Sequence, residues 1–373
     1  MLDRLPVELL RLVLEHLAPL SFTGAEYRRR QSTLAACCVV ARTFREVAQP
    51  LLRQAVLVGG EDAFEDVESV EAIEAALVVD PQIVAQAHVL TALYVERTAL
   101  LRLGQRLSKL DEVRIRGHED IFDAGDLARC FPSLRHIALD EVVLSCAALT
   151  GSFRFLRSLD LRHAHTTCDT LKTILSPVMT PSLGALRLAS LNDDASFTYR
   201  TLMLDLSSCT HLERLDLVQL NVDHDTVALF PSSLAVPLLC EIQPHEYSAD
   251  ELEQLFGVLD TLHARHLQFS LPLDSDRDPF FLDHTLFCLN RLTTWIAVAE
   301  PSLRTLSLPP AIHASRAPPT LIVQAVAALV SECGRRKVEL SWRWGSSPEQ
   351  DQWLNHDFRR YARRLKDAGG EKV

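Results

Sequence analysis

Two stretches of the 373-residue chain share one pattern: residues 183–192 read LGALRLASLN, and residues 212–221 read LERLDLVQLN. In both, leucines alternate with other residues, as at Leu186 and Leu188, which is the period of a strand with one buried face. A single strand cannot bury its own leucines in water. Each stretch therefore predicts one strand of a sheet, and their likeness predicts that the sheet is built from repeated units.

The same pattern recurs on both sides of this pair. Strong copies lie at residues 107–115, 131–139 and 153–161, and weaker echoes lie at 267–269, 303–308 and 338–340. Successive strong copies are separated by about 25 residues, within or near the range of leucine-rich repeats. The segments between them, such as residues 169–175, are long enough for a helix. Stacked units of this kind bury their leucines in a curved parallel sheet with helices on its outer side.

These repeats predict that residues 59–345 form an α/β leucine-rich-repeat solenoid that becomes degenerate after about Phe230. Three prolines interrupt the pattern there: Pro231, Pro237 and Pro244. The number of repeats beyond that point stays open. Near the far end, four apolar residues recur at helical spacing: Leu354, Phe358, Tyr361 and Leu365. We expect a helix within residues 346–373 that caps the last open strand; a helix that binds a partner is the alternative.

Residues 1–58 follow a helical pattern instead. After Pro6, which suits the first turn of a helix, five apolar residues recur at helical spacing: Leu9, Leu10, Val13, Leu14 and Leu17. A second helix is expected from Ser32, as its N-cap, and a third from Arg42 to a stop near Pro50. Residues 18–33 then form a polar loop, and residues 51–58 an extended segment. Three helices in so short a segment have a thin core, so part of their stability can come from a partner.

The run Leu5-Pro6-Val7-Glu8-Leu9-Leu10 and the run from Leu34 to Arg45 resemble the two halves of the F-box, although the link between them is longer than is usual in that family. The family implies a non-catalytic role: the F-box docks on a Skp-type adaptor, which joins it to a cullin and RING scaffold, and the rest of the chain brings a protein substrate for ubiquitination. The resemblance implies nine adaptor-binding residues: Leu5, Pro6, Glu8, Leu9, Leu10, Val13, Val39, Val40 and Phe44. The alternative for each, above all for Val13 and Phe44, is a place in the core of the bundle. The expected fold is therefore α+β overall, with an all-α F-box ahead of the repeats.

A protein substrate is expected to bind on the concave face of the sheet. Residues between the paired leucines of a strand point to the face opposite the leucines, and their neighbours at the strand ends can join them. The expected contacts are Arg114, Arg116, Asp140, Asp160, Arg162, Arg187 and Asp216. Both signs of charge are present, which suits a protein or peptide better than a polyanion. The alternative is that these are ordinary solvated strand positions.

Composition narrows the class of protein. A net charge of −11 argues against a general nucleic-acid binder, which needs a basic face. No apolar run approaches the roughly 20 residues of a membrane span, and charged residues break up the N-terminal run that a secretory signal would need. Nine cysteines without a C-x-x-C pair argue against a disulfide framework and against a zinc site. We expect a protein of the cytoplasm, the nucleus or both.

Sequence motifs for catalysis are missing. The chain has no glycine-rich phosphate loop, no G-x-S-x-G and no H-E-x-x-H. His163 with His165, and His263 with His266, lack further ligands at recognised spacing. We therefore expect neither a metal nor a cofactor, and a substrate-recognition adaptor of an SCF-type ubiquitin ligase is the leading hypothesis. A protein-binding scaffold whose F-box works outside a ligase is the alternative, and an enzyme with a diverged site in residues 231–319 is a third.

Overall fold

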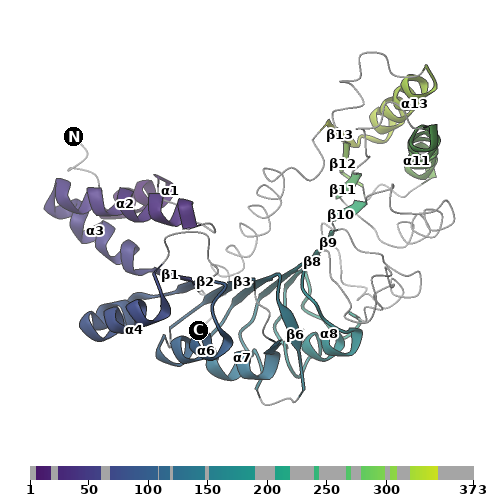
Figure 1. The fold of residues 1–373 in the computed structure, drawn as a ribbon. Coiled ribbons are helices and arrows are strands. Elements are labelled where there is room, and N and C mark those ends of the chain that lie inside the picture. The colour runs from purple at the N-terminus through teal and green to yellow at the C-terminus, as the bar shows by residue number, and fades with distance from the viewer. Residues whose placement is uncertain are drawn as a thin grey trace. The chain divides into compact units, whose positions relative to one another are not determined.

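The structure, a computed structural model, describes residues 6–17, 24–59, 68–107, 109–117, 121–147, 151–189, 206–218, 239–242, 266–269, 279–298, 303–308 and 320–342. Leu5 and the helix expected within residues 346–373 lie outside this part. The described part combines helices with parallel strands (Figure 1). The chain divides into two compact units. Unit 1 comprises Met1–Leu156, His163–Thr166 and Val178–Pro181, and unit 2 comprises Arg157–Arg162, Thr167–Pro177 and Ser182–Val373.

Unit 1 begins with a bundle of three helices, α1 (Val7–Leu17), α2 (Gly24–Val40) and α3 (Arg42–Arg53). The helices share a small apolar core that consists of Leu10, Leu14, Leu34, Phe44, Val47, Ala48 and Leu51. Each of these side chains is less than a tenth exposed, so the bundle has a real but thin interior.

Two helix boundaries in the bundle differ from the sequence prediction. Helix α2 begins at Gly24 and not near Ser32, so most of the expected loop is helical. Helix α3 continues through Pro50 to Arg53, although proline removes a backbone hydrogen-bond donor. Its buried face runs across the proline at helical spacing: Phe44, Val47, Ala48 and Leu51. Burial of this face outweighs the lost hydrogen bond, and the extended segment is shortened to a strand that starts at Ala55.

The bundle is followed in unit 1 by a parallel sheet in the order β1 (Ala55–Gly59), β2 (Val89–Leu93), β3 (Glu112–Arg116) and β5 (His136–Asp140). The strands are in register, so that Val113 lies beside Leu90 and Ile137. Helices α4 (Val70–Val79), α5 (Pro81–Gln86), α6 (Arg97–Arg106) and α7 (Ala124–Cys130) connect the strands, and α4, α6 and α7 lie on one side of the sheet (Figure 1). Two short strands, β4 (Ile121–Asp123) and β6 (Val143–Ser145), pair parallel beside them.

A left-handed residue stands directly after each of three strands in unit 1. Tyr94 follows β2 with φ 53°, Gly117 follows β3 with φ 66°, and Glu141 follows β5 with φ 58°. The Tyr94 N–H donates to Arg116 O (2.8 Å), and the Gly117 N–H donates to Asp140 O (2.9 Å), so these two corners are bonded to the end of the next strand. The chain thus leaves β2, β3 and β5 in the same backbone conformation.

Unit 2 contains, within its described residues, a parallel sheet of seven strands in chain order. They are β7 (Ser158–Arg162), β8 (Ala185–Ala189), β9 (Arg214–Val218), β10 (Leu239–Ile242), β11 (His266–Phe269), β12 (Thr305–Leu308) and β13 (Glu339–Trp342). Strands β8 and β9 come from the two stretches that share the leucine pattern, and they pair with Leu186 beside Leu215. Helix α8 (Cys168–Ile174) follows β7. The predicted large parallel sheet is confirmed.

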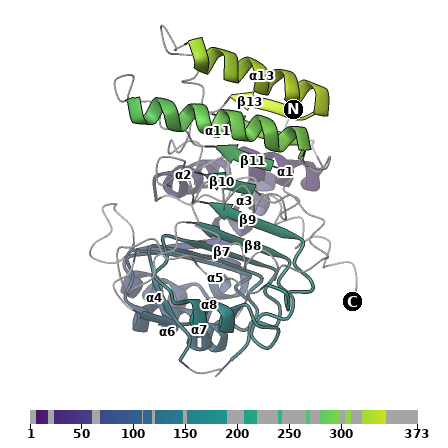
Figure 2. The ribbon, with the colours of Figure 1, turned by 90° about the vertical axis from the view of Figure 1, so that its right-hand side faces the viewer.

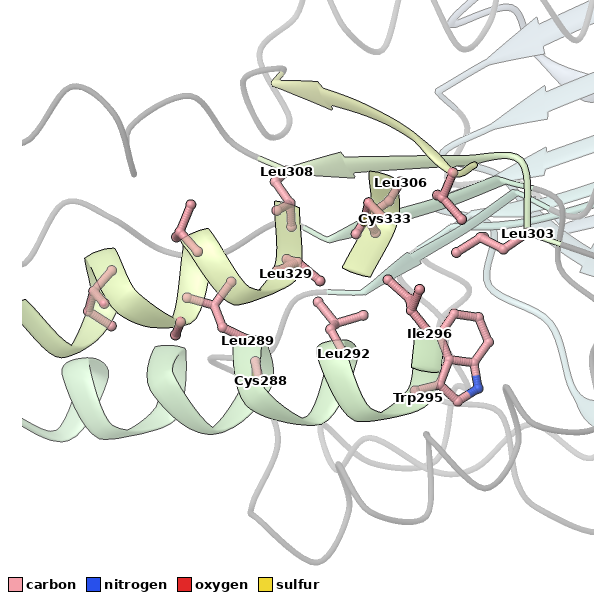
Figure 3. Close-up of a cluster of buried hydrophobic side chains, with 14 residues drawn as sticks. Cys288, Leu289, Leu292, Trp295, Ile296, Leu303, Leu306, Leu308, Leu329 and Cys333 are labelled. Carbon is pink, nitrogen blue, oxygen red and sulfur yellow. The ribbon is translucent and has the colours of Figure 1, made fainter. Parts of the chain in front are cut away.

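Two long helices complete the described part of unit 2, α11 (Pro279–Val298) and α13 (Thr320–Arg336). They lie side by side (Figure 2), α13 packs against β13, and both helices share an apolar cluster with β12. Figure 3 shows the apolar cluster between them, in which Leu292 and Trp295 of α11 and Leu329 of α13 gather near Leu306 of β12. The leucine pattern is degenerate in this region, and α11 was not predicted from the sequence. None of the described helices is long and apolar enough to cross a membrane.

The first testable prediction concerns the corner after β3. A Cβ atom added at Gly117 would lie 2.1 Å from Cε1 of Tyr94, and the backbone there is left-handed. Gly117→Ala should therefore lower the free energy of unfolding by about 2–4 kcal/mol, measured by urea denaturation. The matched control is Gly334→Ala in α13, where an added Cβ meets nothing within 4 Å; it should be neutral or stabilising by up to about 1 kcal/mol. Similar losses in the two variants would contradict this account of the corner.

Candidate functional site

Helix α1 carries two apolar stripes side by side. Leu10 and Leu14, four residues apart, are each 1% exposed and belong to the bundle core. Leu9, Val13 and Leu17 follow at the same spacing, displaced by one position, and are 48%, 39% and 63% exposed. We call these three residues the α1 stripe. One helix thus buries one row of aliphatic side chains and presents a second row at the surface.

Further apolar side chains are exposed on the same bundle. Val7 and Leu12 of α1 are 53% and 61% exposed, and Val39 and Val40 at the end of α2 are 78% and 69% exposed. The F-box resemblance pointed to Val39 and Val40 but not to Val7, Leu12 or Leu17. Separating the apolar residues of α1 into a buried and an exposed row would have found Leu17, because it continues the spacing of the exposed row.

The remaining residues expected to bind an adaptor fall into different places. Pro6 and Glu8 are exposed at the start of α1. Leu10 and Phe44 are buried in the bundle core, at 1% and 8% exposure, so they shape the surface and do not form it. Leu5 lies outside the described residues.

Three of the expected substrate contacts form one row across unit 2. Asp160 in β7, Arg187 in β8 and Asp216 in β9 are register partners on adjacent strands. The sequence correctly places them side by side, but it does not predict their burial: they are 3%, 1% and 0% exposed. Both interpretations made from the sequence required accessible side chains, facing either a partner or solvent. The burial of this row corrects both. Arg114 in unit 1 is likewise buried, at 5% exposure.

Ion pairs along and between strands accompany this burial. Arg214 Nε and Nη2 donate to the two carboxylate oxygens of Asp216 at 2.9 and 2.8 Å. Arg162 Nε donates to Asp160 at 3.0 Å, and Arg187 Nε lies 3.9 Å from the same carboxylate. Burial raises the pKa of Asp216 above its ordinary value, and Arg214 offsets only part of that effect. Charges removed from water are tolerated only when paired in this way.

Sequence analysis missed Arg214, which pairs with Asp216, and Glu112, whose Oε1 accepts from Arg114 Nε at 2.7 Å. A signal for both was present, because side chains two positions apart on a strand lie on the same face. Within the described strands, opposite charges occur at that spacing in β3, β7 and β9, as Glu112-x-Arg114, Asp160-x-Arg162 and Arg214-x-Asp216. The spacing predicts an ion pair within the strand. A charge held in such a pair is not available to bind a partner.

The expected contacts at the strand ends of unit 1 stay accessible. Arg116 lies 3.8 Å from Asp140 Oδ2 and 3.6 Å from Glu141 Oε1, and His163 Nδ1 lies 3.0 Å from Asp140 Oδ1. Their side chains are between 29% and 51% exposed. Burial opposes the charge of Arg116, but Asp140 and Glu141 together raise its pKa. We call Arg116, Asp140, Glu141 and His163 the strand-end cluster.

The described part of the chain was searched for metal ligands and for reactive thiols. No group of three or more His, Cys, Asp or Glu residues in the described part of the chain could hold a metal ion. Burial raises the pKa of Cys288 to about 12 and that of Cys333 to about 11, so both thiols are protonated at neutral pH and are poor nucleophiles. The described residues do form two accessible surfaces, one apolar on the bundle and one charged at the strand ends of unit 1.

No protein-family model matches the chain, and no curated protein matches it.

The second prediction tests the buried row. Arg214→Met leaves the Asp216 carboxylate buried without its bidentate partner, and it should cost about 3–5 kcal/mol of unfolding free energy at pH 7. The double variant Arg214→Met/Asp216→Leu should cost less, because no charge remains to be buried. Urea denaturation of the wild type and both variants measures the two differences.

The pH dependence of this penalty follows from Asp216. A folded-state pKa above the unfolded value means that the protonated carboxyl favours folding at low pH and that this contribution is lost as the pH rises. The Arg214→Met penalty should therefore be smaller at pH 4 than at pH 7. The exposed pair Arg335 and Glu332 provides the control, since Arg335→Met should change stability little at either pH. An equal Arg214→Met penalty at both pH values would contradict this explanation.

Proposed function

We propose that the chain is the substrate-recognition subunit of an SCF-type cullin-RING ubiquitin ligase. Its N-terminal bundle acts as an F-box and docks on a Skp-type adaptor, and its strand–helix units act as leucine-rich repeats that hold a protein substrate. The single observation that best supports this proposal is the α1 stripe, three aliphatic side chains exposed beside a core that they do not enter.

Docking by the α1 stripe is favourable for a simple physical reason. Full burial of one aliphatic side chain contributes about 1.5–3 kcal/mol, and a few such residues dominate many protein interfaces. Among its described residues the bundle core contains seven buried apolar residues, so an adaptor that covers Leu9, Val13 and Leu17 adds substantially to the apolar area buried. Val39 and Val40 give the same partner a second point of contact.

We assign substrate recognition to the strand-end cluster in preference to the buried row of Asp160, Arg187 and Asp216. Arg116 and Asp140 keep part of their charged groups in water, and Glu141 and His163 join them. A partner can reach these groups without breaking the ion pairs of Asp160 and Asp216. The chain itself supplies no catalytic group in this proposal, because ubiquitin transfer belongs to the other subunits of the ligase.

The third prediction tests the docking surface. Leu9→Asp/Val13→Asp should weaken binding of a purified Skp-type adaptor at least about 30-fold, because two apolar contacts are lost and two charges would be buried. Isothermal titration calorimetry measures the affinity, and circular dichroism checks that the helices remain. The matched control is Arg11→Ser/Glu15→Ser, which removes an exposed ion pair from the same helix; it should bind as the wild type does.

Two results of that experiment would count against the proposal. Wild-type protein that does not bind the adaptor removes the F-box assignment, and equal weakening by both variants removes the α1 stripe as the docking surface. A complex that contains the adaptor but recruits no cullin would instead favour a scaffold that works outside a ligase.

A further inference from the structure

The first turns of α2 carry three polar side chains that contact the junction between α3 and β1. Tyr27, Arg30 and Gln31 are spaced so that they share one face of the helix. The Tyr27 hydroxyl donates to Ala55 O at 3.2 Å, Arg30 Nη2 donates to Leu51 O at 2.7 Å, and Gln31 Nε2 donates to Leu52 O at 3.3 Å. Three polar side chains on one face of α2 thus donate to three backbone carbonyls within residues 51–55.

These carbonyls need donors from outside α3. The last four carbonyls of an α-helix have no partner within the helix, and a buried carbonyl left without one is costly. Leu51 and Leu52 lie in the last turn of α3, and Ala55 begins β1. A guanidinium at the C-terminal end of a helix is also favoured by the helix dipole. Arg30 and its neighbours therefore do for α3 what a C-cap does in other helices.

The same junction is held from two other directions. Gln54 is the one residue between α3 and β1, and its carbonyl accepts from the N–H groups of His88 and Val89 at 2.9 and 3.1 Å. Arg53 Nη2 pairs with Asp80 Oδ2 at 2.8 Å, where α4 meets α5. The bundle is therefore joined to the first two strands without a spare residue that could act as a hinge.

Packing alone does not explain why Arg30 is buried, because burying its charge costs free energy. It is 4% exposed, and its Nε and Nη1 atoms have no hydrogen-bond partner among the described residues. Burial lowers the pKa of its guanidinium, an effect that Tyr27 and Glu15 oppose. Burial also raises the pKa of Tyr27, so its hydroxyl keeps the proton that it donates to Ala55 O. The hydrogen bond from Arg30 to Leu51 O, at the end of α3, explains why a cation is buried here.

We infer that Tyr27, Arg30 and Gln31 form a clamp that sets the direction in which the bundle is held on the first strands of unit 1. The α1 stripe and the strand-end cluster are both in unit 1, so the clamp fixes the orientation of these two surfaces relative to each other. That consequence for a ligase rests on the proposed function, whereas the clamp itself does not. The clamp lies in the segment that is longer than in the F-box family and was expected to be a loop.

The test measures the orientation of the bundle directly. A donor and an acceptor dye are attached through genetically encoded amino acids at Val40 in α2 and Arg106 in α6, both exposed. Time-resolved energy transfer then gives the distribution of distances between them in the full chain. We expect a narrow distribution in the wild type and one at least twofold wider in Tyr27→Phe/Arg30→Met/Gln31→Leu, which keeps the size of the side chains but removes the three donors.

The matched control uses the same helix. Ser32 and Thr33 donate only to Arg29 O within α2, at 2.9 and 2.7 Å, so Ser32→Ala/Thr33→Ala removes side-chain hydrogen bonds without touching α3 or β1. The control should keep the narrow distribution. If the triple variant loses helical circular dichroism, Tyr27→Phe/Gln31→Leu, which retains Arg30, takes its place.

An unchanged distribution in the clamp variants overturns the inference, and so does equal widening in the control, because loss of helix stability would then explain the result. The measurement requires no adaptor. Failure of the adaptor to bind would thus remove the proposed function and leave the clamp standing, and a rigid bundle in the clamp variants would do the reverse.

Discussion

A short strand and its helix cannot bury their own aliphatic side chains, and this limit decides how the sheet is assembled. Leu186 and Leu188 are fully buried because strand β8 lies between β7 and β9, each with leucines at the same register. Each unit is therefore completed by the next, which keeps the strands parallel and in chain order. In unit 1 the left-handed corners at Tyr94, Gly117 and Glu141 let the chain leave each strand in the same way.

The same constraint explains why charged residues can occupy the strands. A side chain between two leucines must point to the other face of the sheet, whatever its polarity. In unit 2 that face is itself buried at Asp160, Arg187 and Asp216. The charges are retained because carboxylates and guanidinium groups alternate across the three adjacent strands and pair along β7 and along β9. Such pairs stabilise little compared with apolar packing, but a shift in register would bring like charges together, so they favour one alignment of the strands.

The parts of the fold that could be predicted from the sequence are those decided by local periodicity. Alternating leucines predict the strands, and the spacing of Leu10 and Leu14 predicts α1. The parts that could not be predicted are decided by contacts between distant segments. Arg30 looks like a loop residue until its bond to Leu51 O is seen, and Pro50 looks like a helix stop until the buried face that crosses it is known. For the candidate site, the sequence placed the charged residues in a row correctly, but accessibility depends on what covers a surface, and periodicity carries no information about that.

The bundle shows how a small domain divides its apolar residues between folding and binding. Leu10 and Leu14 of α1 are buried, while Leu9, Val13 and Leu17 on the same helix are exposed. Rotating α1 to bury the second row would expose the first, so no packing of this helix against α3 can satisfy both. The exposed row is therefore not an error of packing that the chain could correct by itself. It is surface that the packing of the bundle leaves exposed, and because α3 runs into β1 through Gln54 alone, a molecule docked there would be held in a fixed relation to the strands that follow.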